Sequence, residues 1–220
     1  MRNTFTFFSL LILISGNVSP CYSNTEEDTL FRKSLSFGVE LSYPARMFFE
    51  PEIKQYEASL DFEFIENVFA VLEAGALQAD VMRDDFNYYS DGAYLRIGAD
   101  FNVLGSGALK DNDKVFVGIR YGYCKQQHSA DNIFVTDNYW GSTTASVEAS
   151  DFNAHWGEFV AGVRTELFAN LSIGWSVRFR LLFSGVGESL VEPYRIGGFG
   201  RGESTTGFDF NYSIFYRIPF

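Results

Sequence analysis

This 220-residue chain lacks any uninterrupted apolar run of about 18 residues, which excludes an ordinary membrane-spanning helix. It is also short of bases. With 17 lysines and arginines against 28 acids, its net charge of −11 argues against a nucleic-acid partner. A hydrophobic fraction of 46% excludes intrinsic disorder, and the length indicates one domain or at most two small ones.

The first 23 residues have the features of an export signal. Arg2 supplies a positive start, and a short apolar core follows from Phe5 to Ser15. Cys21 and Ser23 are small residues at the −3 and −1 positions of a cleavage site after Ser23. We therefore expect residues 1–23 to be a signal peptide. The alternatives are a genuine N-terminal helix or strand, or a lipid-anchored Cys21.

The predicted mature domain, residues 24–220, keeps a single cysteine, Cys124. One cysteine cannot form an internal disulfide, so a disulfide-stapled secreted module is excluded. We interpret Cys124 as a small buried strand residue rather than a nucleophile. Removal of the signal makes the net charge one unit more negative, because residues 1–23 contain one base, Arg2, and no aspartate or glutamate.

The mature part shows the period-two alternation of β-strands. The C-terminus is the clearest case: apolar residues from Phe208 to Phe220 share one face, and Phe215 is the exception on the other. As a soluble edge strand this segment would risk aggregation. The same alternation predicts seven earlier strands, at residues 34–43, 56–64, 68–76, 95–103, 115–124, 158–167 and 171–183.

The connections between these strands alternate in length. Tight turns are expected at Glu66-Asn67 and Ala169-Asn170, with the stretch Gly105–Asp113 on the same side. The longer connections are Pro44–Gln55, Asp80–Gly92, Gln126–Asp151 and Gly185–Thr205. Short turns on one side and long loops on the other are typical of outer-membrane barrels, in which the short turns are periplasmic.

We therefore predict an all-β fold, an eight-stranded antiparallel up-and-down transmembrane β-barrel. A sheet in lipid must close, and eight strands leave an interior that side chains can fill. The alternation points one set of charged residues inward, and the inward glycines leave room for the arginines. The predicted inward charges are Glu40, Glu57, Asp61, Glu63, Glu73, Asp100, Glu158, Glu166, Asp209, Arg96, Arg120, Arg164, Arg178, Arg180 and Arg217.

We interpret this charged interior as an ion-paired plug; the alternative is a selectivity filter or proton path. Aromatic residues near strand ends are candidates for interfacial girdles. They are Tyr43, Tyr56, Tyr123, Tyr216 and Phe220. The connection Gln126–Asp151 leaves a further hairpin open, which would make ten strands, and the conformation of residues 185–205 is likewise open.

The segment Phe210–Phe220 resembles the C-terminal assembly signal of bacterial outer-membrane proteins, apart from Pro219 near its end. Other stretches resemble an uncharacterised family of Bacteroidota outer-membrane barrel proteins. They are Val115–Gly122, Ala154–Gly162, Gly174–Arg178 and Pro193–Gly200. The resemblance implies the barrel fold, the cell outer membrane as location and its lipid as surroundings. It also implies recognition of the strand ending at Phe220 by the barrel-assembly machinery, and it implies no activity.

We assign no catalytic, cofactor-binding or metal-binding residue. His128, Ser129 and Asp131 have the residue types of lipid-acting barrel enzymes, and Asp84-Asp85 and Asp111-Asn112-Asp113 have oxygen ligands suited to calcium. We interpret both sets as ordinary loop residues. The glycine-rich Gly197–Gly202 lacks the strand-to-helix context of a phosphate loop. The segment Tyr139–Thr144 offers aromatic and hydroxyl groups that suit a partner or a glycan.

The favoured hypothesis is a closed outer-membrane barrel with a structural or surface-interaction role and an unidentified partner. Three alternatives stay open: a barrel enzyme that acts on lipids, a narrow channel, and a soluble periplasmic barrel with an apolar interior. The last alternative requires the aromatic face to point inward.

Overall fold

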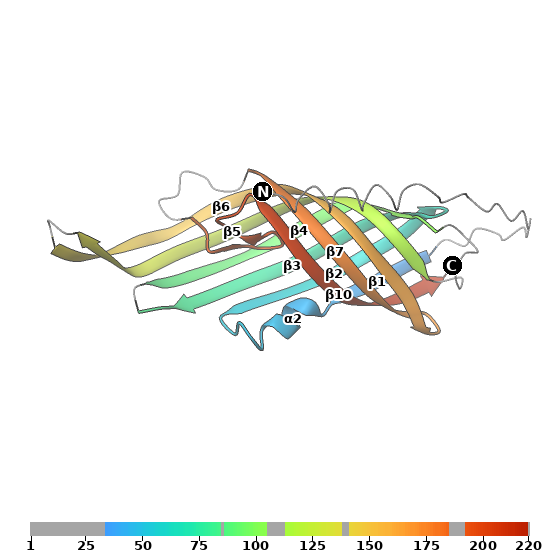
Figure 1. The fold of residues 1–220 in the computed structure, drawn as a ribbon, viewed down its shortest axis with the longest axis horizontal. Helices are drawn as coiled ribbons and strands as arrows, with labels where there is room; N and C mark the ends of the chain where they lie inside the picture. Colours follow the sequence, from blue (N-terminus) through green and yellow to red (C-terminus); the bar gives the residue numbers. More distant parts are fainter. Residues whose placement is uncertain (1–33, 85, 105–112, 138–140, 185–191, 220) are drawn as a thin grey trace, which may run out of the picture. The chain divides into compact units, whose positions relative to one another are not determined.

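The computed structural model describes residues 34–84, 86–104, 113–137, 141–184 and 192–219. Eight strands form the main sheet (Figure 1). They are β1 (Ser34–Glu40), β2 (Ile53–Ile65), β3 (Val68–Met82), β4 (Asn87–Asn102), β5 (Lys114–Asp137), β6 (Gly141–Phe168), β7 (Leu171–Ser184) and β10 (Thr206–Pro219). Helix α2 (Ser42–Arg46) follows β1, and the short strands β8 (Arg195–Ile196) and β9 (Gly200–Arg201) pair between β7 and β10.

The main sheet closes into a barrel in the order β1-β10-β7-β6-β5-β4-β3-β2. All neighbours are antiparallel, and β1 joins the two ends of the series by pairing with both β10 and β2. Seven of these eight strands are at least 13 residues long, and only β1 is shorter. A tilted strand needs about 9–11 residues to cross a bilayer. The predicted fold class, eight strands in up-and-down order, is confirmed.

The two predicted tight turns are built alike. Asn67 and Asn170 have positive φ angles of 63° and 68°, a conformation that asparagine tolerates better than most residues. In each turn a glutamate four residues earlier accepts the asparagine N–H, Glu63 at 3.2 Å and Glu166 at 2.7 Å. These turns lie at the barrel end that also carries the start of β1 and the end of β10.

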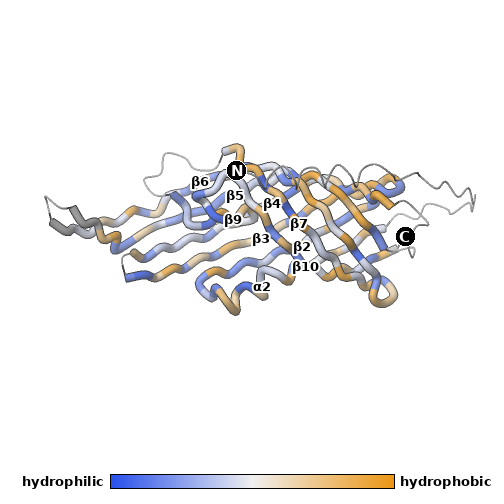
Figure 2. The backbone as a smooth tube through the Cα atoms, in the orientation of Figure 1, coloured by the Kyte–Doolittle hydropathy of each residue, from blue (hydrophilic) through white to orange (hydrophobic). Residues whose placement is uncertain are grey.

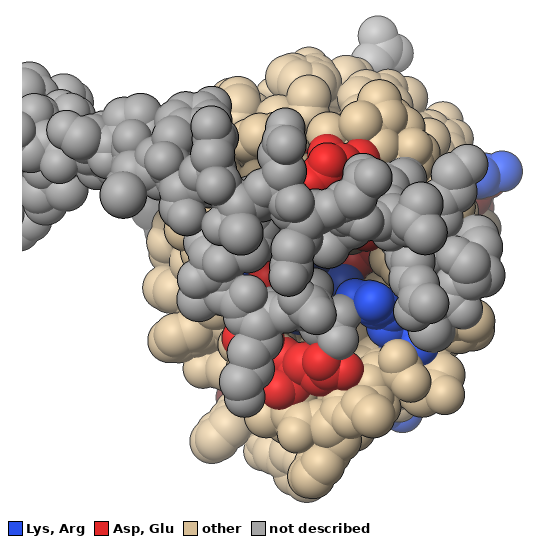
Figure 3. Space-filling view, turned by 90° about the vertical axis from the view of Figure 1, so that its right-hand side faces the viewer, with Lys and Arg blue, Asp and Glu red and all other residues tan. Residues whose placement is uncertain are grey.

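The two faces of the wall differ sharply, as the alternation predicts. Ile119 is 61% exposed on the outside, whereas the next residue, Arg120, is 5% exposed inside. Hydrophobic residues recur along the strands in Figure 2, most densely toward the tight-turn end. Seen from that end, acidic and basic side chains appear within a rim of other residues (Figure 3). The apolar side chains therefore form an outer surface, and the charges face the lumen.

Strands β5 and β6 continue well beyond the rest of the barrel. The connection predicted over Gln126–Asp151 is mostly strand, since β5 runs to Asp137 and β6 begins at Gly141. The segment lengthens two barrel strands instead of adding a hairpin to the ring, so the barrel has eight strands. Residues 126–129 of this extension are polar on both faces, and the register of β5 with β6 is irregular around Ala130, so the alternation of hydropathy that marks a strand is missing there.

The first predicted strand is too long. The alternation predicts that it continues to Tyr43, but β1 ends at Glu40 and α2 begins at Ser42. Pro44 lies in the first turn of α2, where its fixed φ suits a helix and its missing N–H would break a strand ladder. Tyr43 is consequently buried, at 4% exposure, and its assignment to an interfacial girdle is wrong. In the described part of the chain, no helix is long and apolar enough to cross a membrane.

Candidate functional site

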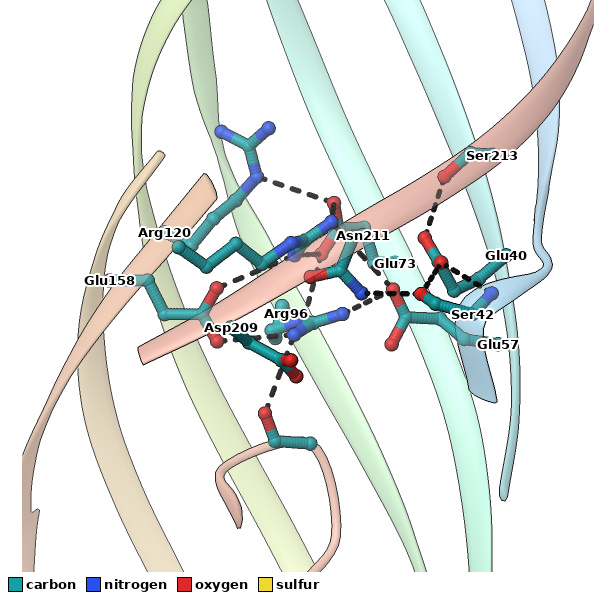
Figure 4. Close-up of polar contacts among 12 residues, drawn as sticks. Glu40, Ser42, Glu57, Glu73, Arg96, Arg120, Glu158, Asp209, Asn211 and Ser213 are labelled. Carbon is teal, nitrogen blue, oxygen red and sulfur yellow. Dashed lines mark hydrogen bonds and ion pairs between the residues drawn. The ribbon is translucent and has the colours of Figure 1, made fainter. Parts of the chain in front are cut away.

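The centre of the lumen is organised around Arg96 of β4, which is fully buried. Its Nε lies 2.7 Å from Glu73 Oε2 and its Nη1 lies 3.1 Å from Glu158 Oε1, and Nη2 pairs with Glu57. These carboxylates come from β3, β6 and β2, so a single guanidinium joins four strands (Figure 4).

Two arginines of β7 extend this network across the barrel. Arg178 donates two hydrogen bonds to the Glu73 carboxylate, from Nη1 at 2.7 Å and from Nη2 at 3.0 Å. The Nε of Arg180 donates to Glu158 at 3.1 Å, and its Nη1 lies 3.3 Å from Asp209 Oδ2. Bidentate guanidinium–carboxylate pairs are among the strongest and most directional hydrogen-bonded contacts in proteins. The network therefore fixes β7 against β3, β6 and β10.

The end of the lumen near the tight turns has its own pairs. Arg120 Nη2 donates to Asp100 Oδ1 at 2.8 Å, and Arg164 pairs with Asp61. Lys114 Nζ lies 3.9 Å from Asp61 Oδ2. Lys114 is 5% exposed and is missed by the sequence prediction, because it opens its strand directly after a connection and the alternation is clear only from the next residue onward.

A cavity of about 30 Å³ remains beside these residues, bordered by Asp61, Asp100, Arg120 and Arg164. A single water needs roughly 10–15 Å³ of such space, so the cavity has room for only a few waters. No cluster of His, Cys, Asp or Glu suited to a metal ion occurs among the residues that the structure describes.

Most of the predicted inward charges are buried: seven of the nine acids and five of the six arginines. The exceptions, Glu63, Glu166 and Arg217, are half-buried. Gly98 makes the expected space for an arginine, since a Cβ there would lie 2.7 Å from Arg120 Cδ, whereas Gly122 makes space for Trp156, whose indole a Cβ would overlap.

The hairpin β8–β9 closes the lumen at the end that is remote from the tight turns. Ile196 and Phe199 are buried against Tyr94, Cys124 and Trp156. This places Cys124 as predicted, in a strand and fully buried.

Polar contacts hold the same hairpin in place. Gly197 N–H donates to Gln126 Oε1 at 2.9 Å, and Gln126 Nε2 donates to Arg195 O at 2.7 Å. Arg180 Nη1 donates to Phe199 O at 3.0 Å. The glycine-rich segment Gly197–Gly202 thus belongs to a plug that is bonded to the barrel wall.

Side chains replace backbone partners where β1 ends. Glu40 is 3% exposed, and its carboxylate accepts hydrogen bonds from Ser42 N at 3.0 Å and Ser213 Oγ at 2.6 Å (Figure 4). It also accepts the Tyr212 N–H at 3.0 Å. The carbonyl of Leu41 instead accepts Ala45 N at 3.0 Å inside α2. Glu40 therefore closes the wall at the point where the chain leaves it.

The candidate enzyme residues do not come together. His128 is 2% exposed and faces the inside of the extension, where Tyr88 and Phe152 pack against it. Ser129 and Asp131 alternate to the opposite face, since adjacent strand residues point in opposite directions. Burial lowers the pKa of His128 below its usual value.

The other sequence candidates have mixed outcomes. Asp113 accepts the backbone N–H of Glu166 at 2.8 Å. Gly105–Asn112, Asp85, Tyr139, Trp140, Phe220 and the predicted signal peptide lie outside the described residues.

Aromatic residues do gather on the outer wall at the level where β5 begins its extension. Tyr121 and Tyr123 flank His155, with Tyr121 Oη 2.6 Å from His155 Nδ1 and the Tyr123 ring centroid 4.9 Å from that of His155. Tyr123 also donates to Asn153 Oδ1 at 2.9 Å. Of the predicted girdle residues, Tyr56 and Tyr216 are exposed like Tyr123.

The whole chain, residues 1–220, matches one protein family. This protein belongs to the family described as a domain of unknown function, DUF6048. No curated protein sequence matches it.

Several solved structures are similar in fold at low sequence identity. A major outer membrane protein from Thermus thermophilus is 11% identical, with 85% of this chain and 99% of that chain covered and a TM-score of 0.47. The N-terminal β-barrel domain of Pseudomonas aeruginosa OprF is 9% identical, covers 85% and 97%, and has a TM-score of 0.43. Ail of Yersinia pestis, in complex with a heparin analogue, is 9% identical, covers 85% and 97%, and has a TM-score of 0.38.

Proposed function

We propose that this protein is an outer-membrane β-barrel with a sealed, ion-paired lumen and a structural or surface-interaction role. The observation that carries the proposal is the opposition of the two wall faces. Phe159, Trp175 and Phe210 are each more than half exposed on the outside, whereas the acids and arginines are buried within. Soluble monomers rarely expose apolar patches larger than a few hundred Å². Lipid is the solvent that suits this surface.

The direction of the faces favours a membrane barrel over a soluble ligand carrier. A soluble barrel for an apolar ligand would place its aromatic face inward, and here Phe208, Tyr212 and Ile214 point outward. The inside offers charged groups already paired with each other. The apolar side chains within the barrel, such as Tyr94 and Trp156, are already covered by Ile196 and Phe199 of the β8–β9 hairpin segment.

The filled lumen favours a closed barrel over a conducting one. Arg96, Arg178 and Glu158 occupy its centre, β8–β9 closes the end that is remote from the tight turns, and the cavity beside Asp61 and Arg164 is only about 30 Å³. Removing one partner from a buried ion pair typically costs about 3–5 kcal/mol, so transient opening through the network is expensive. We expect no stepwise conductance in planar bilayers.

The extension of β5 and β6 supports a surface-interaction role. Strand β6 pairs with β7 only from His155 onward, so in the described part of the chain its segment 141–154 has β5 on one side and no strand on the other. A free strand edge can receive an extended segment of another protein through main-chain hydrogen bonds. We propose this edge as the contact surface for an outer-surface partner.

The proposal includes export and assembly. Residues 1–23 are the signal peptide, residues 24–220 are the mature domain, and the strand that ends at Phe220 is recognised by the barrel-assembly machinery. Placement of the protein among Bacteroidota belongs to the same proposal. It rests on the sequence resemblance.

Cell fractionation combined with electrophoresis tests the location. The full chain should be found in outer-membrane fractions and should migrate faster when loaded without boiling than after boiling, as folded membrane barrels do. Recovery of the protein in the soluble periplasmic fraction, with no heat-dependent shift, would contradict the proposal. Deletion of Phe220 should reduce assembly, whereas a soluble barrel would fold without it.

A further inference from the structure

An apolar groove of about 610 Å³ crosses the outward face of β4 to β7. Ala99 and Ala161 are small residues within it, and Phe101, Phe159 and Phe179 project beside them. Close packing on an apolar surface depends on shape, so such a groove receives a flexible hydrocarbon chain better than a flat wall does.

A polar cluster lies farther along the same face of β5 and β6. The register pairs Ile119 with Phe159 in the groove, and two residues farther along each strand it pairs Tyr121 with Gly157. The next outward pair is Tyr123 with His155. Because successive outward residues are about 7 Å apart along a strand, the phenol and imidazole groups lie directly beyond the apolar groove.

Charged groups of both signs follow in the next two rows. Lys125 is paired with Asn153, and Gln127 is paired with Asp151. Asp91 of β4 faces Gln127 from the other side. Lys125, Asp91 and Asp151 are all exposed, and none of the described ion pairs involves them. The face thus presents, in order, a hydrocarbon groove, hydrogen-bonding aromatic groups, one cation and two carboxylates.

We infer that this face binds one phospholipid whose headgroup carries both a phosphate and a primary ammonium group. One acyl chain occupies the groove beside Ala161. The phosphate forms an ion pair with the ammonium group of Lys125 beside the Tyr123 ring, and the ammonium group of the lipid faces Asp151 and Asp91. The inference rests on the proposed membrane location and specifies which lipid class the wall selects.

Native mass spectrometry of the folded, detergent-solubilised protein tests this inference. The probes are phosphatidylethanolamine, phosphatidylcholine and phosphatidylglycerol with identical acyl chains. We expect one molecule of phosphatidylethanolamine to bind on the order of tenfold more tightly than the other two, a difference of about 1.4 kcal/mol. Equal binding of all three lipids, or a second copy of the chain bound in place of lipid, would overturn the inference.

Two variants separate the groove from the headgroup site. Ala161→Leu fills the groove and should abolish the preferred first binding event, whereas Ala74→Leu, an outward substitution on β3 away from the groove, should leave it unchanged. Asp151→Asn should remove the preference for ethanolamine over choline without loss of folding, because Asp151 is exposed in the extension. Unaltered selectivity in both Ala161→Leu and Asp151→Asn would refute the site. Failure of the membrane proposal is distinguishable, since the protein would then be soluble without detergent.

Discussion

The wall of this barrel is built in two ways. From β3 to β6 the strands are 15 to 28 residues long, and backbone ladders join them with few irregularities. The closing seam is the place where β1 pairs with both β2 and β10. Because β1 has only seven residues, residues 53–57 of β2 and 206–212 of β10 have no strand between them. Side chains take over at the seam: Glu40 accepts the Tyr212 N–H and Asp209 accepts the Phe210 N–H.

The difference between the two regions shows what the charged lumen does for the fold. Helix α2 replaces the missing part of β1, and its Tyr43 and Arg46 contact Arg180 and Asp209 of the interior network. In the wall from β3 to β6, the ion-pair network of the lumen serves mainly to neutralise the buried charges of these strands. The seam needs it to stay closed.

The largest loss of stability is expected from replacing Arg96, whose ion pairs reach both β2 at the seam and the wall from β3 to β6. Arg96→Ala leaves Glu57, Glu73 and Glu158 without their central partner, so stability should fall by about 3–5 kcal/mol. Urea unfolding in detergent or lipid would measure the loss. Arg83→Ala is the control: its exposed pair with Glu52 should contribute no more than about 1 kcal/mol. Equal effects of the two variants would contradict the central role of Arg96.

Glu40→Ala should open the seam selectively. It removes the acceptor of the part-buried Tyr212 N–H and Ser213 hydroxyl and leaves the Tyr212 N–H only the longer contact to Ser42 Oγ at 3.4 Å, so stability should fall by about 1–3 kcal/mol. Hydrogen exchange should rise in β1 and β10 but not in β5. Glu40→Gln retains an acceptor for the Tyr212 N–H and should lose much less. A uniform rise in exchange around the barrel would show that the seam is not a separate region.

Arg46→Ala tests the attachment of α2 with a smaller expected effect. The Arg46 side chain is 37% exposed and its partner Asp209 also pairs with Arg180, so we expect a loss of about 1 kcal/mol. Limited proteolysis would measure this effect. If α2 has detached, we expect cleavage near Lys54 in addition to cleavage after Arg83. Cleavage at Arg83 alone would argue against an effect at the seam.

The smallest effect concerns pH and the extension. Burial lowers the pKa of His128, so the unfolded chain binds a proton more readily than the folded one. The neutral imidazole therefore supports stability at pH values above about 6.5, and this support is lost as pH falls below that value. Proteolysis of the extension should increase between about pH 7.5 and pH 5. His128→Gln should remove this increase, and an unchanged profile would refute the assignment.

The alternation of apolar and polar residues in the sequence is sufficient to predict the strands that have one apolar face and one charged face. It places Arg96, Glu73 and Arg178 inside correctly, because a period of two decides the face of every residue once the strand is recognised. Lys114 is missed because it stands at the boundary of a strand. Boundaries depend on ladder contacts that one sequence does not contain.

The features beyond the barrel wall have no local signal. The extension of β5 begins with residues that are polar on both faces, as Gln126 and Gln127 illustrate, and the hairpin β8–β9 acquires its structure by packing on Tyr94 and Trp156. Pro44 is the one local sign that β1 ends early, since proline is poorly suited to a strand interior. The burial of Tyr43 follows from that early end.

The central claim is that lipid surrounds the apolar face while the charged face encloses a sealed lumen. Two native tryptophans test it directly: Trp175 is 53% exposed on the outer wall, and Trp156 is fully buried inside. Single-tryptophan proteins, with Trp140 and either Trp156 or Trp175 replaced by Phe, would be refolded into bilayers of brominated lipid. We expect strong quenching of Trp175 fluorescence and little quenching of Trp156. Quenching of Trp156 with none at Trp175, or of neither residue, would contradict the account.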